Sequence, residues 1–237
     1  MDAAMYKALS GAVAQMRRLE VTAQDLANVN TSGYKGQRLS FSEVLANRLP
    51  PDERPGGLVA VAGQRTNLGQ GEIHGTGNPF NLALEGDGFF VIQTARGERY
   101  TRNGAFTLKA DGTLVTAQGD ALLAEGGPIQ VTGAKMDVAG DGTVTSDDGE
   151  LGKIRIVRFA DPRRVVKEGA NLFVSDAANV QPATDLRVLQ GSLEHSNVSP
   201  IDGMLSLIAL NRQFEASEHA MKLMDSVTEK MLSDGAR

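Results

Sequence analysis

Three histidines, His74, His195 and His219, have the most versatile side-chain chemistry in this sequence. Imidazole serves as a general base and as a ligand for transition metals. Both roles need partners at a suitable spacing, and none of the three lies in an H-E-x-x-H pair or another close metal-ligand pattern. The sequence therefore predicts a structural or solvated role for each histidine.

The acidic residues offer two further kinds of chemistry, calcium binding and glycoside hydrolysis. Five acids gather in one stretch, namely Asp137, Asp141, Asp147, Asp148 and Glu150. Their spacing does not fit the D-x-[DN]-x-[DN]-G calcium loop, and acids at hairpin tips are usually turn formers. A pair of carboxylates can hydrolyse a glycosidic bond, but spacing singles out no pair among the 29 acidic residues.

Nucleophilic and phosphate-binding patterns are missing from the sequence. There is no cysteine, no G-x-S-x-G elbow and no G-x-x-x-x-G-K-[ST] loop. The glycine-rich segments at residues 69–71 and 75–77 lack the strand-then-helix setting of a nucleotide-binding loop. The sequence therefore predicts a protein that is not an enzyme and that holds no metal or cofactor.

The overall charge and hydropathy exclude several partners. A formal net charge of −5, from 29 acids and 24 bases, argues against a general nucleic-acid binder. No apolar run approaches the roughly 20 residues of a membrane-spanning helix. The first 30 residues lack the basic start, apolar stretch and cleavage site of a secretory signal. We therefore expect no nucleic acid, no membrane insertion and no cleaved signal peptide.

Charge is unevenly placed in the middle of the chain. Residues 111–150 hold eight acids against one base, Lys135, whereas residues 153–167 hold six bases against one acid, Asp161. An acidic and a basic surface on one domain favour head-to-tail contact between copies or related subunits. Ordinary solvated faces are the alternative.

A long helix is predicted at each end of the chain. Apolar or small residues repeat at alternating spacings of four and three in residues 1–30, and a second helix with a similar stripe is predicted over 202–232, after Pro200. Each stripe is narrow, so the two seams most simply bury each other, although each helix could instead pack separately on the middle. The large seam residues are Met5, Leu9, Met16, Leu19 and Leu26 in the first helix and Leu207, Leu210, Phe214, Met221 and Met224 in the second.

The sequence between the helices is typical of a linker followed by short strands and turns. Residues 36–75 include the stretch PPDERPGG at 50–57, which argues against regular structure there. Over residues 76–190, short apolar runs alternate with glycine-containing turn signals, which predicts an all-β domain, either a sandwich or a partly open barrel. The sequences DGTL at 111–114 and DGTV at 141–144 predict two similar hairpins.

Four separated motifs resemble those of bacterial flagellar rod and hook proteins, and together they span nearly the whole chain. They are LANVNTSGYK at residues 26–35, TGNPFNLALEGDGFF at 76–90, YTRNGAF at 100–106 and GSLEHSNV at 191–198. The residues of the first motif that carry the resemblance are Asn28, Asn30, Thr31, Gly33, Tyr34 and Lys35.

The expected fold class is α+β, with paired, coiled-coil-like N- and C-terminal helices flanking a central all-β domain, in agreement with this resemblance. The expected parts are an N-terminal helix of the axial core at 1–35, a linker and extended segment at 36–75, an all-β outer domain at 76–190 and a C-terminal helix of the axial core at 191–237.

The resemblance implies a structural subunit of the flagellar basal-body rod, the periplasmic drive shaft that transmits torque and encloses the export channel. It implies polymerisation through the terminal helices, with copies of itself and other rod subunits as partners. It also implies export by the flagellar type III apparatus without cleavage. Phe41 and Leu45 resemble the two anchors of the family's export signal, and a local packing cluster is the alternative for them.

Within this family, the short length and the sequences RTNL at 65–68 and RQFE at 212–215 favour a proximal-rod subunit. The complete GDGFF sequence at 86–90 is at least as typical of distal-rod and hook-type axial subunits. Two other classes stay open, a β-domain surface or carbohydrate-binding module and a carbohydrate-active enzyme. Assembly with rod proteins, saturable glycan binding and catalytic turnover distinguish the three classes.

Overall fold

The computed structural model describes residues 2–44, 58–133, 135–183 and 185–235, and the chain divides into two compact units. Both units are built from segments that are far apart in the sequence. The first unit comprises Met1–Ala27, Gln37–Arg65 and Ser199–Arg237, and the second comprises Asn28–Gly36 and Thr66–Val198.

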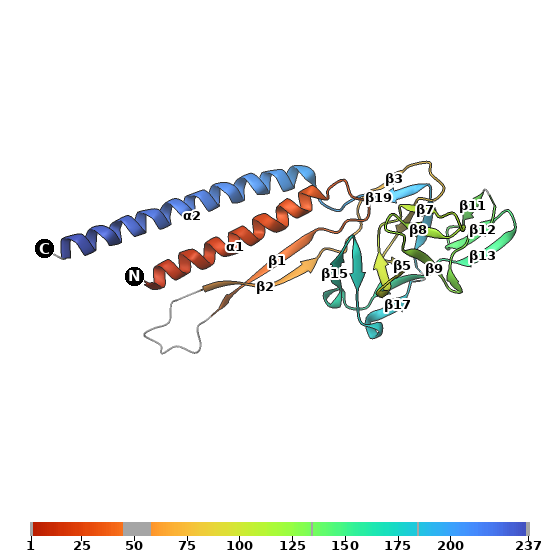
Figure 1. Ribbon diagram of the computed structural model, residues 1–237, viewed down its shortest axis with the longest axis horizontal. Helices are drawn as coiled ribbons and strands as arrows, with labels where there is room; N and C mark the ends of the chain where they lie inside the picture. The colour runs from red at the N-terminus through yellow and green to blue at the C-terminus, as the bar shows by residue number, and fades with distance from the viewer. Residues whose placement is uncertain (1, 45–57, 134, 184, 236–237) are drawn as a thin grey trace. The chain divides into compact units, whose positions relative to one another are not determined.

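The first unit contains the two terminal helices, α1 (Asp2–Ala27) and α2 (Pro200–Gly235), which lie side by side and run in opposite directions (Figure 1). α1 ends where Asn28 begins a turn. α2 begins two residues earlier than predicted, because the Ser199 hydroxyl accepts a hydrogen bond from the Asp202 amide at 3.3 Å. Pro200 is suited to the first helical position, where its missing N–H costs no bond.

The contact between the helices involves only part of the predicted seam. Leu210 is buried, and Leu19, Leu26, Leu207, Phe214 and Met221 are half-buried. Gly203 lets the Leu26 side chain approach, since a Cβ at that position would lie 3.5 Å from Leu26 Cδ1. The side chains of Met5 and Met224 lie outside the described residues.

Leu9 and Met16 of the predicted seam are not buried in the single chain, where these residues are 52% and 50% exposed. The buried residues of α1 are instead the smaller Ala12, Ala14 and Val21. A heptad stripe assumes one partner, but α1 contacts both α2 and a strand, β1. Packing on two sides rotates Leu9 and Met16 away from the interior of this unit.

Residues 36–75, which were predicted as a linker and extended segment, contain two paired strands that the prediction did not specify. β1 (Gln37–Val44) and β2 (Leu58–Thr66) pair as a two-stranded sheet within the first unit. The Asp25 carboxylate of α1 accepts a hydrogen bond from the Gln37 amide at 3.0 Å. Half-buried Leu39 and Phe41 alternate with polar neighbours, which is the period-two pattern of a strand. The predicted irregular stretch at 50–57 lies outside the described residues.

The second unit is built mainly from short strands, as expected for the middle of the chain. Its strands are β3 (Ile73–Gly75), β4 (Leu82–Glu85), β5 (Phe89–Thr94), β6 (Gly97–Thr101), β7 (Phe106–Leu108), β8 (Leu114–Thr116), β9 (Ala121–Ala124), β10 (Gly127–Pro128), β11 (Met136–Val138), β12 (Thr143–Ser146), β13 (Gly149–Lys153), β14 (Ile156–Phe159), β15 (Val166–Gly169), β16 (Leu172–Val174), β17 (Val180–Pro182), β18 (Arg187–Gln190) and β19 (Ser192–Glu194). Two 3-10 turns, η2 (Pro162–Arg164) and η3 (Ala177–Asn179), lie among them.

The largest sheet runs in the order β15-β16-β6-β5-β9-β8-β7, and β14 joins β5 to β17. β11, β12 and β13 form a separate sheet, while β4 pairs with β18 and β3 with β19. The two hairpins predicted from their Asp-Gly turns are present. Asp111 and Asp141 each accept a hydrogen bond from the amide two residues later, at 2.9 and 3.1 Å.

Strand β5 is buried on both faces and separates two hydrophobic clusters. Phe90 and Ile92 belong to the larger cluster, which also includes residues from β4, β8, β12 and β18. Phe89 and Val91 point into the smaller cluster, with Tyr100 and Phe173. The continuous apolar sequence of β5 follows from this double burial. β5 also fixes the position of the loop before it, residues 86–88.

Candidate functional site

Glu194, at the end of β19, has a fully buried carboxylate that is held by two cations. Its Oε1 accepts hydrogen bonds from Lys35 Nζ at 2.5 Å and from the Gly71 amide at 2.9 Å. Its Oε2 accepts one from Arg102 Nε at 2.5 Å. The side chains of Lys35, Arg102 and Glu194 are 0%, 3% and 0% exposed. We call these three residues the buried ion triad.

The triad carries one excess positive charge, which backbone carbonyl groups offset. Arg102 donates from Nη2 to Leu84 O at 3.0 Å and to Gly86 O at 2.6 Å, and from Nη1 to Gly88 O. Lys35 Nζ donates to Gly69 O at 2.6 Å. Since buried charges are tolerated only when they are paired and hydrogen-bonded, these carbonyls complete the site.

Burial lowers the pKa of the Lys35 ammonium from its ordinary value of 10.5, and the attraction of Glu194 acts in the opposite direction. The buried surroundings disfavour the charged form of any ammonium, whereas a neighbouring carboxylate favours it. The lowered pKa therefore shows that removal from water is the larger effect at Lys35. Truncation of either partner would leave an uncompensated buried charge.

Lys35 reaches Glu194 because the segment Asn28–Gly36 is part of the second unit and is held tightly within it. The Gly33 amide donates to Glu194 O at 2.8 Å. Gly33 has φ of +66°, and a Cβ on it would lie 2.3 Å from the Asn103 amide nitrogen. Only glycine fits there, because it combines a left-handed backbone with the close approach of another chain segment.

The hairpin formed by β15 and β16 holds the same segment from another side. Lys167 Nζ lies 3.6 Å from the centroid of the buried Tyr34 ring, and it donates to Lys35 O at 3.0 Å. The Asn171 side chain donates to Ser32 O at 3.2 Å. These contacts fix the backbone on both sides of Tyr34, and so they fix the direction in which Lys35 enters the site.

Asn197 joins three chain segments next to the triad. Its Oδ1 accepts from the Gly36 amide at 2.9 Å, and its Nδ2 donates to Asn67 O and Gly69 O, each at 2.8 Å. The Asn67 amide in turn donates to Gly36 O at 2.8 Å. The Asn197 side chain thus connects residues that are close in sequence to three of the points where the chain passes from one unit to the other.

The four motifs that carried the family resemblance meet at this site. Lys35 comes from the first motif, Leu84, Gly86 and Gly88 from the second, Arg102 from the third and Glu194 from the fourth. Of the other residues singled out in the first motif, Gly33 and Tyr34 also belong to the site. Asn28 and Thr31 form the turn after α1, with the Thr31 amide donating to Asn28 O at 3.0 Å, and Asn30 is exposed.

The sequence analysis assigned no role to Arg102, Glu194 or Asn197, although each of them lies within one of the four motifs. The available signal was period two. Glu194 lies between half-buried Leu193 and exposed His195, and in a strand its carboxylate must point to the face opposite those two side chains. Its partners at positions 35 and 102 could not be inferred, because pairing across that distance has no local pattern.

The two residues of the predicted export signal are only partly described. The Phe41 ring, on β1, is half-buried, and the Arg18 guanidinium carbon lies 6.0 Å from its centroid. Leu45 lies outside the described residues. Phe41 therefore has a packing role in the first unit.

The terminal helices expose a second set of apolar side chains. Leu9, Val13 and Met16 follow one another along an open face of α1. Ile201, Leu205 and Ile208 do the same on α2, about half a turn around the helix from the buried Leu210. Neither α1 nor α2 contains, within its described residues, a stretch that is long and apolar enough to span a bilayer.

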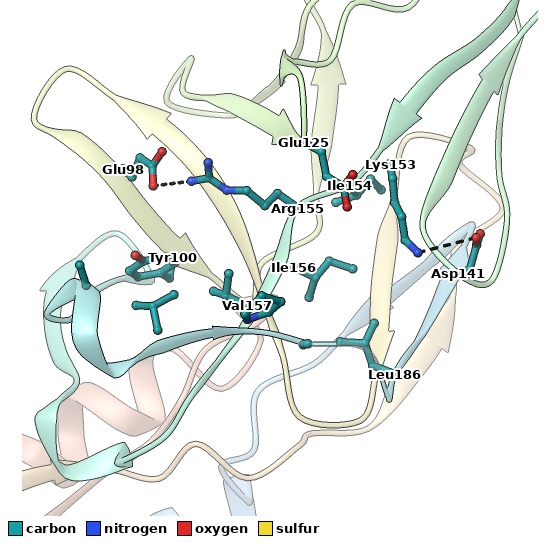
Figure 2. Close-up of a pocket in the computed structure, with 14 residues that line it drawn as sticks. Glu98, Tyr100, Glu125, Asp141, Lys153, Ile154, Arg155, Ile156, Val157 and Leu186 are labelled. Carbon is teal, nitrogen blue, oxygen red and sulfur yellow. Dashed lines mark ion pairs between the residues drawn. The ribbon is translucent and has the colours of Figure 1, made fainter.

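A groove of about 570 Å³ on the second unit is lined by three acids, Glu98, Glu125 and Asp141, and two of them are paired with bases (Figure 2). Glu98 and Asp141 lie on opposite sides of it, and each faces its own base. Arg155 pairs with Glu98, and Lys153 Nζ lies 3.9 Å from Asp141. In the described ranges, no three or more His, Cys, Asp or Glu residues form a group that could hold a metal ion.

Comparison with known proteins gives matches to three family descriptions along the chain. Residues 5–35 match the flagella basal body rod protein, 83–146 the flagellar hook protein FlgE/F/G D1 domain, and 189–234 the flagellar basal body rod FlgEFG protein C-terminal region. The three matches include Lys35, Arg102 and Glu194.

Full-length relatives show the same similarity. The flagellar basal-body rod protein FlgF of Caulobacter vibrioides is 35% identical, with 97% of this chain and 95% of the relative covered. FlgF of Salmonella typhimurium is 33% identical, with 97% and 95% covered. FlgG of Borreliella burgdorferi is 31% identical, with 94% and 95% covered.

Proposed function

This chain belongs to the flagellar basal-body rod protein family, and we propose that it is a subunit of the proximal rod, in the position of FlgF. It is a structural subunit of the flagellar basal body, assembles with other rod components and is not an enzyme. The observation that carries the proposal is the 35% identity to a FlgF over 97% of the chain. The sequence is most like the FlgF members of the family.

The proximal position is tested by finding which rod segment contains the chain. We expect cells lacking it to stop assembly before the distal rod, and purified basal bodies to hold the chain below FlgG. Site-specific cross-linking from exposed positions of the second unit identifies the neighbours. Cross-links only to hook components would instead favour a hook-type axial subunit.

We further propose that the outward apolar faces of the two terminal helices form the polymer contact. The inward face, with Leu210, holds α1 and α2 together, whereas Leu9, Val13, Ile201 and Ile208 remain half or more exposed in the single chain. Such side chains gain from burial against a neighbouring subunit, at about 1.5–3 kcal/mol each. Helices arranged in this way would enclose the export channel and transmit torque.

Two substitutions in α2 separate the inward face from the outward one. Ile208→Asp should leave the helical content of the free subunit unchanged but prevent incorporation into basal bodies and abolish swimming. Leu210→Asp should reduce the helical content itself, because it places a charge inside the unit. Asn211→Asp, at an exposed polar position, is the matched control and should swim. Normal swimming of the Ile208→Asp strain would refute the outward contact.

We also propose that the chain leaves the cell through the flagellar type III apparatus without cleavage, using Phe41 and Leu45 as the signal. A Phe41→Ala, Leu45→Ala double variant should stay inside the cell, while Ser42→Ala, at an exposed neighbour, should be exported. Mass spectrometry of assembled protein should find the N-terminal residues intact. Normal export of the double variant would remove this signal, and a mature chain starting after residue 15 would remove the uncleaved route.

A further inference from the structure

His74 and His195, which are 121 residues apart in the sequence, lie in contact on the exposed face of the β3–β19 pair. Their ring centroids are 4.5 Å apart in an edge-to-face arrangement. In the register of this pair His74 faces Leu193, and the His195 amide donates to Glu72 O at 2.8 Å. The two imidazoles are therefore diagonal neighbours, the placement from which long side chains on adjacent strands reach each other.

Glu72 orients one of the two rings. Its Oε2 lies 3.3 Å from His74 Nε2, and an ionised carboxylate can only accept a hydrogen bond. The contact favours the tautomer of the His74 ring that carries its proton on Nε2, in which the Nδ1 lone pair is the ligand atom. A carboxylate that fixes the imidazole tautomer in this way is the usual support of a metal-binding histidine.

We propose that His74 and His195 form a binding site for a divalent transition-metal ion, with Glu72 as the residue that positions His74. Two imidazoles select Zn²⁺, Ni²⁺ or Cu²⁺ over Mg²⁺ and Ca²⁺, which prefer oxygen ligands. The His74 side chain is 55% exposed, so an ion has access and water completes the coordination. Nothing in the family assignment depends on this site.

A metal ion at this site would connect β3 to β19 beside Glu194. Glu194 lies on the opposite face of β19, where it is paired with Ile73 and holds the buried ion triad. Because an ion that binds only the folded chain raises its stability, occupancy would strengthen the strand pair that carries the central carboxylate.

The test is a titration of the full chain, made without an added histidine tag, with ZnCl2 and separately with MgCl2. Calorimetry should detect one Zn²⁺ per chain and no Mg²⁺, and Zn²⁺ should raise the melting temperature and slow amide exchange in β19. His195→Ala and His74→Ala should each abolish the binding, and Glu72→Gln should weaken it about tenfold. All three positions are exposed, so these variants should fold as the parent does, as circular dichroism will check.

His219→Ala is the matched control, because it removes the third histidine, on α2, and leaves the pair intact. It should bind Zn²⁺ as the parent chain does. Unchanged binding by His195→Ala would overturn the proposal, because the ion would then sit elsewhere. Absence of Zn²⁺ binding at millimolar concentration by the parent chain would overturn it as well.

Discussion

Glu194 balances two cations that lie out of reach of water, so its charge matters more than its size. Glu194→Ala should lower the free energy of unfolding by about 3–5 kcal/mol, because it leaves Lys35 and Arg102 buried without a counter-charge. Urea denaturation followed by circular dichroism measures the loss. Glu85→Ala, at an exposed acid on β4, is the control and should cost less than 1 kcal/mol. An equally small loss for Glu194→Ala would show that the triad is not needed for stability.

The hairpin turn at Asp141 gives a prediction about pH. The Thr143 amide and then the Thr143 hydroxyl, 3.0 Å from Oδ2, lower the pKa of Asp141 below its ordinary 3.8. A carboxyl group with a lowered pKa stabilises the fold above that ordinary value, and its contribution is lost as the pH falls through the lowered pKa. Carboxyl carbon NMR should find a pKa below 3.8 for the parent.

Thr143→Val removes the hydroxyl contribution and keeps the amide. We expect it to move the pKa of Asp141 partway back toward 3.8. Asp111, in the similar hairpin, serves as the internal reference, since its pKa is lowered by Thr113 and should not change. An unchanged Asp141 pKa in Thr143→Val would mean that the backbone amide acts alone.

At the scale of single residues, the sequence identified the positions that need a special backbone or carry a recognised motif. Gly33, Tyr34 and Lys35 were found in this way. Arg102 and Glu194 were not given a role, because a charged residue in or just after a short strand usually points to solvent. Their burial depends on the partners that meet them, and those partners come from distant parts of the sequence.

Among the elements, the β15–β16 hairpin contains a strained turn. Ala170 and Asn171 have φ of +46° and +59°, the left-handed region, and Asn171 donates to the first motif at Ser32. Alanine is disfavoured there by its Cβ. Ala170→Gly should therefore raise the free energy of unfolding by about 1 kcal/mol.

Urea denaturation should compare the free energies of unfolding of Ala170→Gly and Ala177→Gly with that of the parent chain. Ala177 lies in η3 with an ordinary backbone, so glycine there should destabilise through added freedom of the unfolded chain. A loss of stability in both variants would show that the turn at Ala170 is not strained.

The two terminal helices were located correctly from the sequence, but the buried face of α1 differs from the predicted seam. Spacings of three and four located α1 and α2 well, and they also suggested one seam. Leu9 and Met16 fit that seam but face outward, because the β1–β2 sheet occupies another side of α1. The sheet itself was missed because its strands flank a proline-rich stretch that suggested a linker. Local periodicity identifies the apolar side chains of a helix, but the partner that each side chain contacts depends on the fold of the whole chain.

The whole molecule divides differently from the four consecutive parts that the sequence suggested. The chain passes between its two units four times, after Ala27, Gly36, Arg65 and Val198. The unit with the buried triad therefore needs the nine residues Asn28–Gly36, which come from the N-terminal side of both strands of the first unit. The all-β middle was predicted, but this insertion of the first motif into it was not.

A fragment of residues 66–198 should accordingly be incomplete. It retains Glu194 and Arg102 but lacks Lys35, Tyr34 and the backbone that covers them. A synthetic peptide of residues 28–36 should bind the fragment and raise its melting temperature. The same peptide with Lys35→Met, of similar size but uncharged, is the control and should bind at least tenfold more weakly. Equal effects of both peptides would assign the stabilisation to Tyr34 and the backbone alone.

The contact between Lys35 and Glu194 also constrains the order of folding, because the two residues are 159 positions apart in the sequence. The Arg102–Glu194 link spans 92 of the same positions. Contacts of such high sequence separation form slowly and only after the intervening chain is available. A chain that emerges N-terminus first from a ribosome or a narrow conduit must therefore present its first 193 residues before the central carboxylate appears. Completion of this unit is a late event that coincides with arrival of nearly the entire subunit.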